Sequence, residues 1–186
     1  MSELAPPSGV LLLCLDLQPV FLKVVADSDQ LLRRCGFAIS AAAGLGLPVV
    51  FTEQAPQKLG GTAPALLALA ADASVFPKKT FSALGDPEIR AALLEKRRVE
   101  HLLLCGLETP VCVYQSAADA LAAGIEVTIL SDCVGARRTE DAVVCLKSLR
   151  HAGAHVLPAE TVFYAMLREV NHPFFRTFTQ LVKLHG

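Results

Sequence analysis

The chain alternates short, almost wholly apolar runs with longer segments that have the length and the small-residue content of helices. Six runs are short enough for strands: residues 10–15, 48–52, 74–76, 101–105, 126–130 and 155–157. Five of them are nearly continuously apolar, whereas a strand with one face in water alternates apolar and polar residues. This pattern is typical of a parallel sheet that helices cover on both faces.

The segments between these runs carry the residues that begin and end helices. They are residues 28–44, 63–71, 87–98, 112–123 and 140–152, followed by a last helix near 172–184. Pro87 and Thr139 stand at expected starts, and Gly46, Gly124 and Gly153 follow expected ends. The sequence therefore predicts an α/β protein: a three-layer αβα sandwich around a mostly parallel, Rossmann-like sheet of about six strands. Without a linker or repeat, residues 1–186 are expected to form a single domain.

Composition narrows the classes of partner. With 186 residues, 53% of them hydrophobic, the chain is long enough for a core buried on several faces. A formal net charge of −1 without blocks of like charge predicts no nucleic-acid or membrane partner and favours a small molecule. The start lacks the basic flank and cleavage site of a signal peptide, and the longest apolar run, residues 10–15, is too short to cross a bilayer. We expect a soluble, cytoplasmic protein.

Of six cysteines, one stands where a thiol is expected to be reactive. Residues 14, 35, 105, 112, 133 and 145 form no C-x-x-C pair, and all six are expected to be reduced. Cys14 and Cys105 lie inside apolar strands and Cys145 lies inside a helix, positions where free cysteine is usually a small buried hydrophobe. Cys112 instead follows a strand and a turn, in the first turn of a helix. Because a helix N-terminus favours an anion, we expect a lowered pKa and a nucleophilic thiolate there.

Two further polar residues end strands and are expected to meet Cys112. Asp16 follows the first strand and Lys78 the third, and parallel sheets bind ligands outside the carboxyl ends of their strands. Asp16 is suited to take the thiol proton and to return it to a leaving amine, while Lys78 would keep Asp16 charged or stabilise the thiolate. Backbone N–H groups of the turn before Cys112 would hold an oxyanion. Together these groups predict a cysteine hydrolase.

Taken singly, each of these residues has a plainer explanation. An aspartate after a strand is often a turn or cap residue, a lysine such as Lys78 is often a solvated loop charge, and Cys112 alone suits a buried helix start. Only their joint placement favours catalysis. The histidines, at positions 101, 151, 155, 172 and 185, fall at no strand end that faces the site, so we prefer the carboxylate–lysine pair to a Cys–His dyad.

Three segments resemble the motifs of the isochorismatase-like hydrolases, a family that includes nicotinamidases and N-carbamoylsarcosine amidohydrolase. The segments are Asp16-Leu17-Gln18 with Phe21, the stretch Lys78-Lys79-Thr80-Phe81-Ser82-Ala83-Leu84, and residues 106–120 around Cys112. The likeness spans nearly the whole chain and is greatest to the isochorismatase domain-containing protein subgroup, through residues 52–62 and 81–82. It implies Asp16, Lys78 and Cys112 as catalytic residues.

The resemblance also implies details of the site. It implies a cis peptide at Leu107–Glu108, an oxyanion hole formed by the N–H groups of Glu108 and Cys112, a turn braced by Thr109, and a structural Asp132. Residues 52–60 lack the histidine of the nicotinamidase metal site, so we expect no catalytic metal. We also expect no cofactor. True isochorismatases do without the cysteine, which favours cleavage of an amide-type C–N bond through an acyl-enzyme. The pocket is expected to be lined by Gln18, Phe21, Gln54 and Phe81.

Two other functions fit the same scaffold. A catalytically silent small-molecule-binding or protein-interaction module would show an ordinary Cys112 pKa and slow alkylation at neutral pH. A redox sensor would oxidise Cys112 and needs a resolving cysteine, which the nearby sequence lacks. The resemblance further implies a homo-oligomer, for which residues 173–178 offer aromatic surface, although core packing explains that stretch equally well. The substrate and the number of subunits do not follow from the sequence.

Overall fold

A computed structural model describes residues 8–185 of the chain, and its centre is one sheet of six parallel strands. The strands are β1 (Val10–Leu15), β2 (Val49–Gln54), β3 (Ser74–Lys78), β4 (His101–Gly106), β5 (Glu126–Val134) and β6 (His155–Leu157). Their spatial order is β3-β2-β1-β4-β5-β6. The predicted α/β class and the parallel sheet are confirmed. Residues 1–7, which include most of the start considered for a signal peptide, lie outside the described residues.

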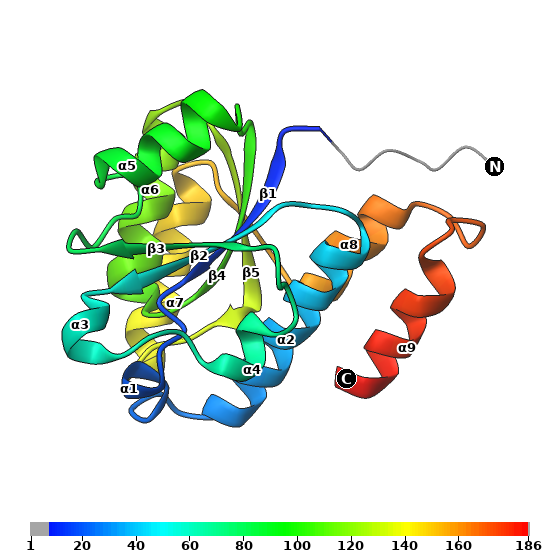
Figure 1. Cartoon of the computed structure of the whole chain (residues 1–186), viewed down its shortest axis with the longest axis horizontal. Coiled ribbons are helices and arrows are strands. Elements are labelled where there is room, and N and C mark those ends of the chain that lie inside the picture. The colour runs from blue at the N-terminus through cyan, green and yellow to red at the C-terminus, as the bar shows by residue number, and fades with distance from the viewer. Residues whose placement is uncertain (1–7, 186) are drawn as a thin grey trace.

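Helices cover both faces of this sheet (Figure 1). One side carries α2 (Ser28–Gly44), α4 (Pro64–Leu67), α8 (Ala159–Leu167) and α9 (Phe175–His185). The other side carries α5 (Pro87–Arg90), the π-helical segment η1 (Ala91–Lys96), α6 (Tyr114–Ala122) and α7 (Thr139–His151). Three short elements border the strand ends: α1 (Pro19–Leu22), α3 (Pro56–Leu59) and the π-helical turn η2 (Thr109–Val113).

The strand β1 shows why the apolar runs are continuous. Leu11 and Leu13 point into the core beneath α5 and α6, whereas Leu12 and Cys14 point into the core beneath α2. All four side chains are at most 1% exposed. Because helices shield both faces, every position of a central strand has to be apolar, as the sequence pattern predicts.

The order of strands creates a switch point between β1 and β4. From β1 the chain moves outward to β2 and β3 on one side, and then returns to place β4 on the other side of β1. The connections that leave the carboxyl ends of β1 and β4 therefore diverge. In open α/β sheets a crevice forms at this position and holds the ligand.

Several helices and strand ends differ from the sequence prediction. The segments α1, α3 and α8 were not expected, residues 63–71 yield only the short α4, and residues 87–98 divide into α5 and η1. The strands β2, β3 and β5 run past their apolar parts into polar residues such as Gln54 and Lys78. Hydrogen bonding between parallel strands continues there because backbone groups, not side-chain polarity, make the ladder. Lys78 is thus part of β3.

The aromatic stretch near the C-terminus belongs to the core. Phe178 is fully buried, and its ring lies 5.6 Å from that of Phe37 on α2 and 6.4 Å from that of Phe163 on α8. This packing holds α9 against α2 on the outer side of the molecule (Figure 1). Of the two explanations that the sequence left open for these aromatic residues, core packing therefore accounts for Phe178. Within residues 8–185, no helix is long and apolar enough to cross a membrane.

Candidate functional site

Asp16 and Lys78 form a buried ion pair at the carboxyl end of the sheet. Asp16 directly follows β1 and has a φ of 50°, a left-handed conformation that aspartate tolerates better than most residues. The Lys78 Nζ lies 2.6 Å from Oδ2 of Asp16, and both residues are at most 2% exposed. The other carboxylate oxygen, Oδ1, accepts a 2.8 Å hydrogen bond from the Thr52 hydroxyl. The carboxylate is therefore held in one orientation from two neighbouring strands.

The Lys78 Nζ also connects this carboxylate to the predicted nucleophile. It lies 3.6 Å from Sγ of Cys112 and donates to Oε1 of Gln54 at 2.6 Å and to the carbonyl oxygen of Thr80 at 3.2 Å. Asp16 follows β1, Lys78 ends β3 and Cys112 lies in η2 after β4, and these segments are distant in sequence. The structure brings together the three residues that were predicted to meet.

Cys112 lies in η2, which continues into α6, so the expected position near a helix start is correct. The expected lowered pKa is wrong. Burial of the side chain, which is 6% exposed, together with the neighbouring Asp16 carboxylate, raises the pKa of the Cys112 thiol to about 12, although Lys78 opposes this change. Desolvation and a nearby negative charge outweigh the opposing charge of Lys78. A pKa this high corresponds to a protonated thiol at neutral pH.

The Asp16 carboxylate is suited to receive that proton. Burial raises the pKa of Asp16 from its usual value, and the charge of Lys78 only partly offsets this effect. A carboxylate with a raised pKa is a stronger base than an exposed one, and it lies beside a thiol whose proton needs an acceptor. The raised pKa of both groups favours a protonated Cys112 thiol beside Asp16 over a thiolate.

The turn that precedes Cys112 is fastened to the segment after β5. The Leu107–Glu108 peptide bond is cis. The carbonyl oxygen of Gly135 accepts two hydrogen bonds from Thr109, at 2.8 Å from its N–H and at 3.0 Å from its hydroxyl. The Nε of Arg137 donates to Oε2 of Glu108 at 3.0 Å. Two adjacent residues of the turn are thereby tied to two residues beyond β5.

These groups surround a pocket of about 280 Å³. It is lined by Asp16, Phe21, Gln54, Phe81, Leu107, Glu108, Val111, Cys112 and Arg137. Phe21, Gln54 and Phe81 therefore line it as expected, while Lys78 lies behind Asp16 and Cys112. The sequence prediction missed Leu107, Val111 and Arg137. Arg137 gave no sequence signal because it stands beside a second arginine in a loop.

Gln18 does not line the pocket, so that expectation is wrong. Its side chain is fully buried and bonds the backbone of Gln54 twice: its Oε1 accepts from the Gln54 N–H at 2.7 Å, and its Nε2 donates to the Gln54 carbonyl at 3.1 Å. The same Nε2 donates to the carbonyl of Gly60 at 2.5 Å. Gln18 thus acts through Gln54, which lines the pocket and accepts from Lys78. The sequence did not separate the two roles, because Gln18 and Gln54 are both glutamines near the end of a strand.

The remaining cysteines and acidic residues lie elsewhere. All six cysteines are free thiols, and Cys112 is the only one that lines the pocket among the described residues. Asp132 accepts from Arg34 at 2.8 Å and from the N–H of Ala159 at the start of α8, which is a structural role. Across residues 8–185, no group of three or more His, Cys, Asp or Glu side chains is placed to hold a metal ion.

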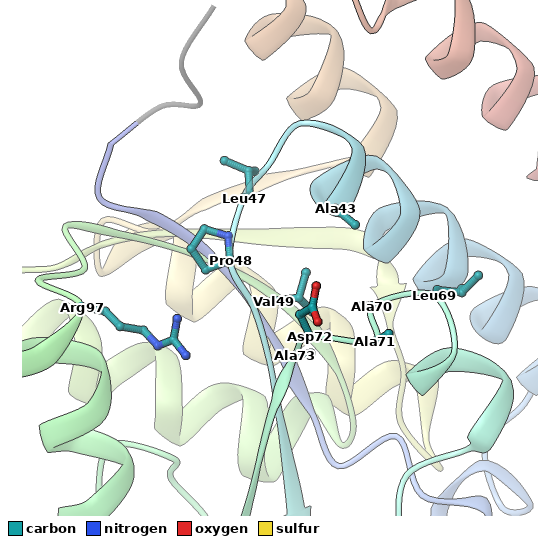
Figure 2. A pocket seen from close by; sticks show the side chains of 10 residues that line it. All are labelled: Ala43, Leu47, Pro48, Val49, Leu69, Ala70, Ala71, Asp72, Ala73 and Arg97. Carbon is teal, nitrogen blue, oxygen red and sulfur yellow. The ribbon is translucent and has the colours of Figure 1, made fainter. Parts of the chain in front are cut away.

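A second cavity, of about 330 Å³, lies at the opposite end of the sheet (Figure 2). It is bordered by the end of α2, the start of β2 and the segment before β3, and its charged residues are Asp72 and Arg97. Arg97 donates to the Ser74 hydroxyl at 2.9 Å. The lining residues include no thiol and no histidine, and the amino ends of parallel strands are not where such sheets bind ligands. The pocket at Cys112 is therefore the candidate active site.

Comparisons with known proteins agree with this fold. Residues 10–161 match the family model described as Isochorismatase domain. The secreted isochorismatase effector Isc1 of Phytophthora sojae (strain P6497) is 31% identical over 100% of this chain and 89% of its own length. Isochorismatase domain-containing protein 2A of Mus musculus is 30% identical over 98% and 86%. The solved structure of the MAR1 ribonuclease from Caenorhabditis elegans has a TM-score of 0.89 and 30% identity, and the alignment covers 96% of this chain and 91% of that one.

Proposed function

Because the chain belongs to the isochorismatase family, we propose that it is a cysteine hydrolase that cleaves an amide-type C–N bond of a small molecule through an acyl-enzyme. One observation carries this proposal. The Lys78 Nζ lies within reach of both the Asp16 carboxylate and the Cys112 thiol, and the latter two line one pocket. A base, a nucleophile and a cation so arranged are the groups that acyl transfer to a thiol requires.

In the first half of the reaction, the Cys112 Sγ attacks the amide carbonyl carbon while its proton passes to Asp16. The N–H groups of Glu108 and Cys112 are proposed to hold the oxyanion, at the turn fastened to Gly135. Asp16 then delivers the proton to the leaving nitrogen, and the C–N bond breaks to leave a thioester. In the second half, Asp16 removes a proton from a water molecule whose oxygen attacks the thioester carbon. The C–S bond breaks, the acid is released, and Asp16 returns the proton to the Cys112 Sγ.

The raised pKa of Cys112 is compatible with this route. From the sequence alone, slow alkylation at neutral pH indicates a silent binding module, but a buried carboxylate beside the thiol changes that inference. A thiol can be unreactive at rest and still lose its proton to Asp16 once a carbonyl group is bound. The silent module therefore has to be distinguished by turnover and by the covalent intermediate.

The test is capture of the acyl-enzyme. We expect incubation with a panel of small amides to release amine from at least one compound. After acid quenching, intact mass should reveal an acyl group on the protein, and peptide mapping should locate it at Cys112. The Cys112→Ala variant should lose both signals, whereas Cys145→Ala, which removes a thiol outside the pocket, should keep them. Binding of amides to the folded protein without amine release or adduct would replace the hydrolase by the binding module.

The name of the C. elegans neighbour raises RNA cleavage as a rival. Among the described residues, Arg137 is the only basic side chain that lines the pocket, and Glu108 accepts a hydrogen bond from it. The chain as a whole has a net charge of −1. RNA binding relies on a positively charged surface that follows the backbone phosphates. We therefore keep a small-molecule amide as the proposed substrate.

A single domain over residues 1–186, a homo-oligomer, a cytoplasmic location and the absence of metal and cofactor remain predictions. One relative is named a secreted effector, so localisation has to be measured for this chain. Sedimentation at several protein concentrations measures the assembly, and metal analysis of purified, active protein measures the metal content.

A further inference from the structure

The pocket has apolar walls and a second charged group besides the catalytic residues. Phe21, Phe81, Leu107 and Val111 provide the apolar surface. Asp16, which also lines the pocket, is already neutralised by Lys78 behind it. The other charged pair is Glu108 with Arg137. A ligand that fills this pocket therefore meets the Cys112 thiol, apolar side chains and a guanidinium group.

The guanidinium of Arg137 is only partly used by the protein. Its Nε donates to Glu108 Oε2 at 3.0 Å, and in residues 8–185 no hydrogen bond is formed by its two Nη nitrogens. The side chain of Arg137 is 62% exposed, whereas that of Glu108 is 12% exposed. The contact through Nε orients the group and leaves the fork of Nη donors available. This fork matches the two oxygens of a carboxylate.

The orientation of Arg137 is linked to the turn that carries the proposed oxyanion hole. Glu108 supplies both the partner of Arg137 and one of the proposed oxyanion-binding N–H groups. Thr109 binds Gly135, two residues before Arg137, through two hydrogen bonds. The guanidinium is thus held at a defined place relative to the reacting end of a ligand, as a specificity determinant has to be.

From these contacts we propose that Arg137 binds an anionic group of the substrate, so that this site acts on small amides that also carry a carboxylate. That the substrate is an amide rests on the proposed function. That Arg137 binds an anionic group does not. Arg137 is a specificity residue here and takes no part in bond cleavage. The negative charge of Glu108 repels the same anionic group, so Glu108 limits the affinity of the pocket for the substrate.

Two maleimides test this proposal without knowledge of the substrate. The Cys112 thiol adds across the maleimide C=C bond, so that an Sγ–C bond forms and the thiol proton ends on the neighbouring carbon. 3-Maleimidopropionic acid carries a carboxylate, and its methyl ester is neutral. We measure the rate constants of both at Cys112 by peptide mass and compare their ratio, acid over ester, with that of glutathione, which corrects for intrinsic reactivity.

The corrected ratio is expected to exceed one in the native chain and to fall about fivefold in Arg137→Met, a size typical of an ion pair that is partly exposed to water. It should rise in Glu108→Gln, which removes the opposing charge. Arg138→Met is the matched control: Arg138 pairs with Asp141 on α7 and does not line the pocket. That variant should leave the ratio unchanged.

A ratio that is the same in the native chain, Arg137→Met and Arg138→Met overturns the proposal. A general loosening of the turn would change the ratio in the same direction in Arg137→Met and Glu108→Gln. Opposite changes in these two variants therefore exclude it. Failure of the hydrolase proposal appears differently, as an absence of amine release. A ratio that depends on Arg137 without turnover would still establish recognition of anions, by a binding pocket.

Discussion

At the scale of single residues, Asp16 and Lys78 have opposite effects on the pKa of the Cys112 thiol. Burial and the Asp16 carboxylate raise the pKa of the thiol to about 12, while Lys78 acts to lower it. The carboxylate that serves as the proposed base is therefore also a cause of the raised pKa of the thiol. Reactivity of the free thiol and turnover of a substrate should respond in opposite directions when Asp16 is changed.

We expect Asp16→Asn to speed alkylation of Cys112 by iodoacetamide near neutral pH, because only the lysine then acts on the thiol. The same variant should lose amide hydrolysis by about 10²–10⁴-fold, the usual loss when a general base is removed. Lys78→Met should slow alkylation. In the native chain, hydrolysis should decline as the pH falls through the raised pKa of Asp16, since the base then becomes protonated.

Alkylation rates against pH, followed by peptide mapping, and amine release provide these measurements. Cys145→Ala is the control for labelling outside the site. If Asp16→Asn lowered alkylation and hydrolysis together, the carboxylate would be promoting formation of a thiolate in the resting protein, and proton transfer only after substrate binding would be wrong.

At the scale of elements, the site depends on how closely β1 and β4 approach each other. Gly106, the last residue of β4, has a φ of +117°, and a Cβ at this position would overlap the carbonyl oxygen of Leu15 on β1. Asp16 directly follows Leu15, the last residue of β1, and the turn to Cys112 begins after Gly106. The missing side chain of Gly106 therefore lets the two connections of the switch point start side by side.

Gly106→Ala is expected to lower the free energy of unfolding by more than about 3 kcal/mol, because backbone atoms cannot move aside as a side chain can. The matched control is Gly124→Ala, where φ is +77° and, among residues 8–185 other than its own chain neighbours, no atom lies within 4 Å of the added Cβ. That change should cost only about 1 kcal/mol, from the backbone conformation alone. Urea unfolding of both variants measures the difference, and equal losses would show that the close approach is unimportant.

At the scale of the whole molecule, the C-terminal helix completes one of the two cores. Phe178 on α9 contacts aromatic rings from α2 and α8, and its ring lies 4.9 Å from that of Tyr164 in an edge-on arrangement. The family match ends at residue 161, so α9 lies outside the matched segment. The helix nevertheless shares a continuous core with the sheet.

Phe178→Ala should lower the free energy of unfolding by about 3–5 kcal/mol, as is usual for a large aromatic residue removed from a core. Leu184→Ala is the control on the same helix, since Leu184 is 73% exposed, and it should change stability by less than about 0.5 kcal/mol. Denaturant unfolding and sedimentation should be measured together. Equal stability of Phe178→Ala and Leu184→Ala would show that the packing of Phe178 contributes little to this core.

The sequence alone determined the class of fold and the identity of the catalytic candidates. Strands buried on both faces require continuous apolar runs, and polar residues at their carboxyl ends stand out against them, as Asp16 does. Short helices such as α3 and the division between α5 and η1 were not predictable, because local propensity hardly distinguishes one helical turn from a loop. The sequence also did not distinguish the roles of Gln18 and Gln54, because both have the same amide side chain. In the structure, Gln18 is buried and holds the backbone of Gln54, whereas Gln54 lines the pocket.

Only the tertiary structure decided the pKa of Cys112 and which of the two adjacent arginines, Arg137 or Arg138, lines the pocket. The pKa of Cys112 depends on burial and on the distance to Asp16, which lies 96 positions earlier in the chain, and such terms are absent from any local pattern. Arg137 and Arg138 are adjacent and chemically identical in the sequence. Only the folded turn directs one of them to Glu108 and the pocket and leaves the other on the surface with Asp141.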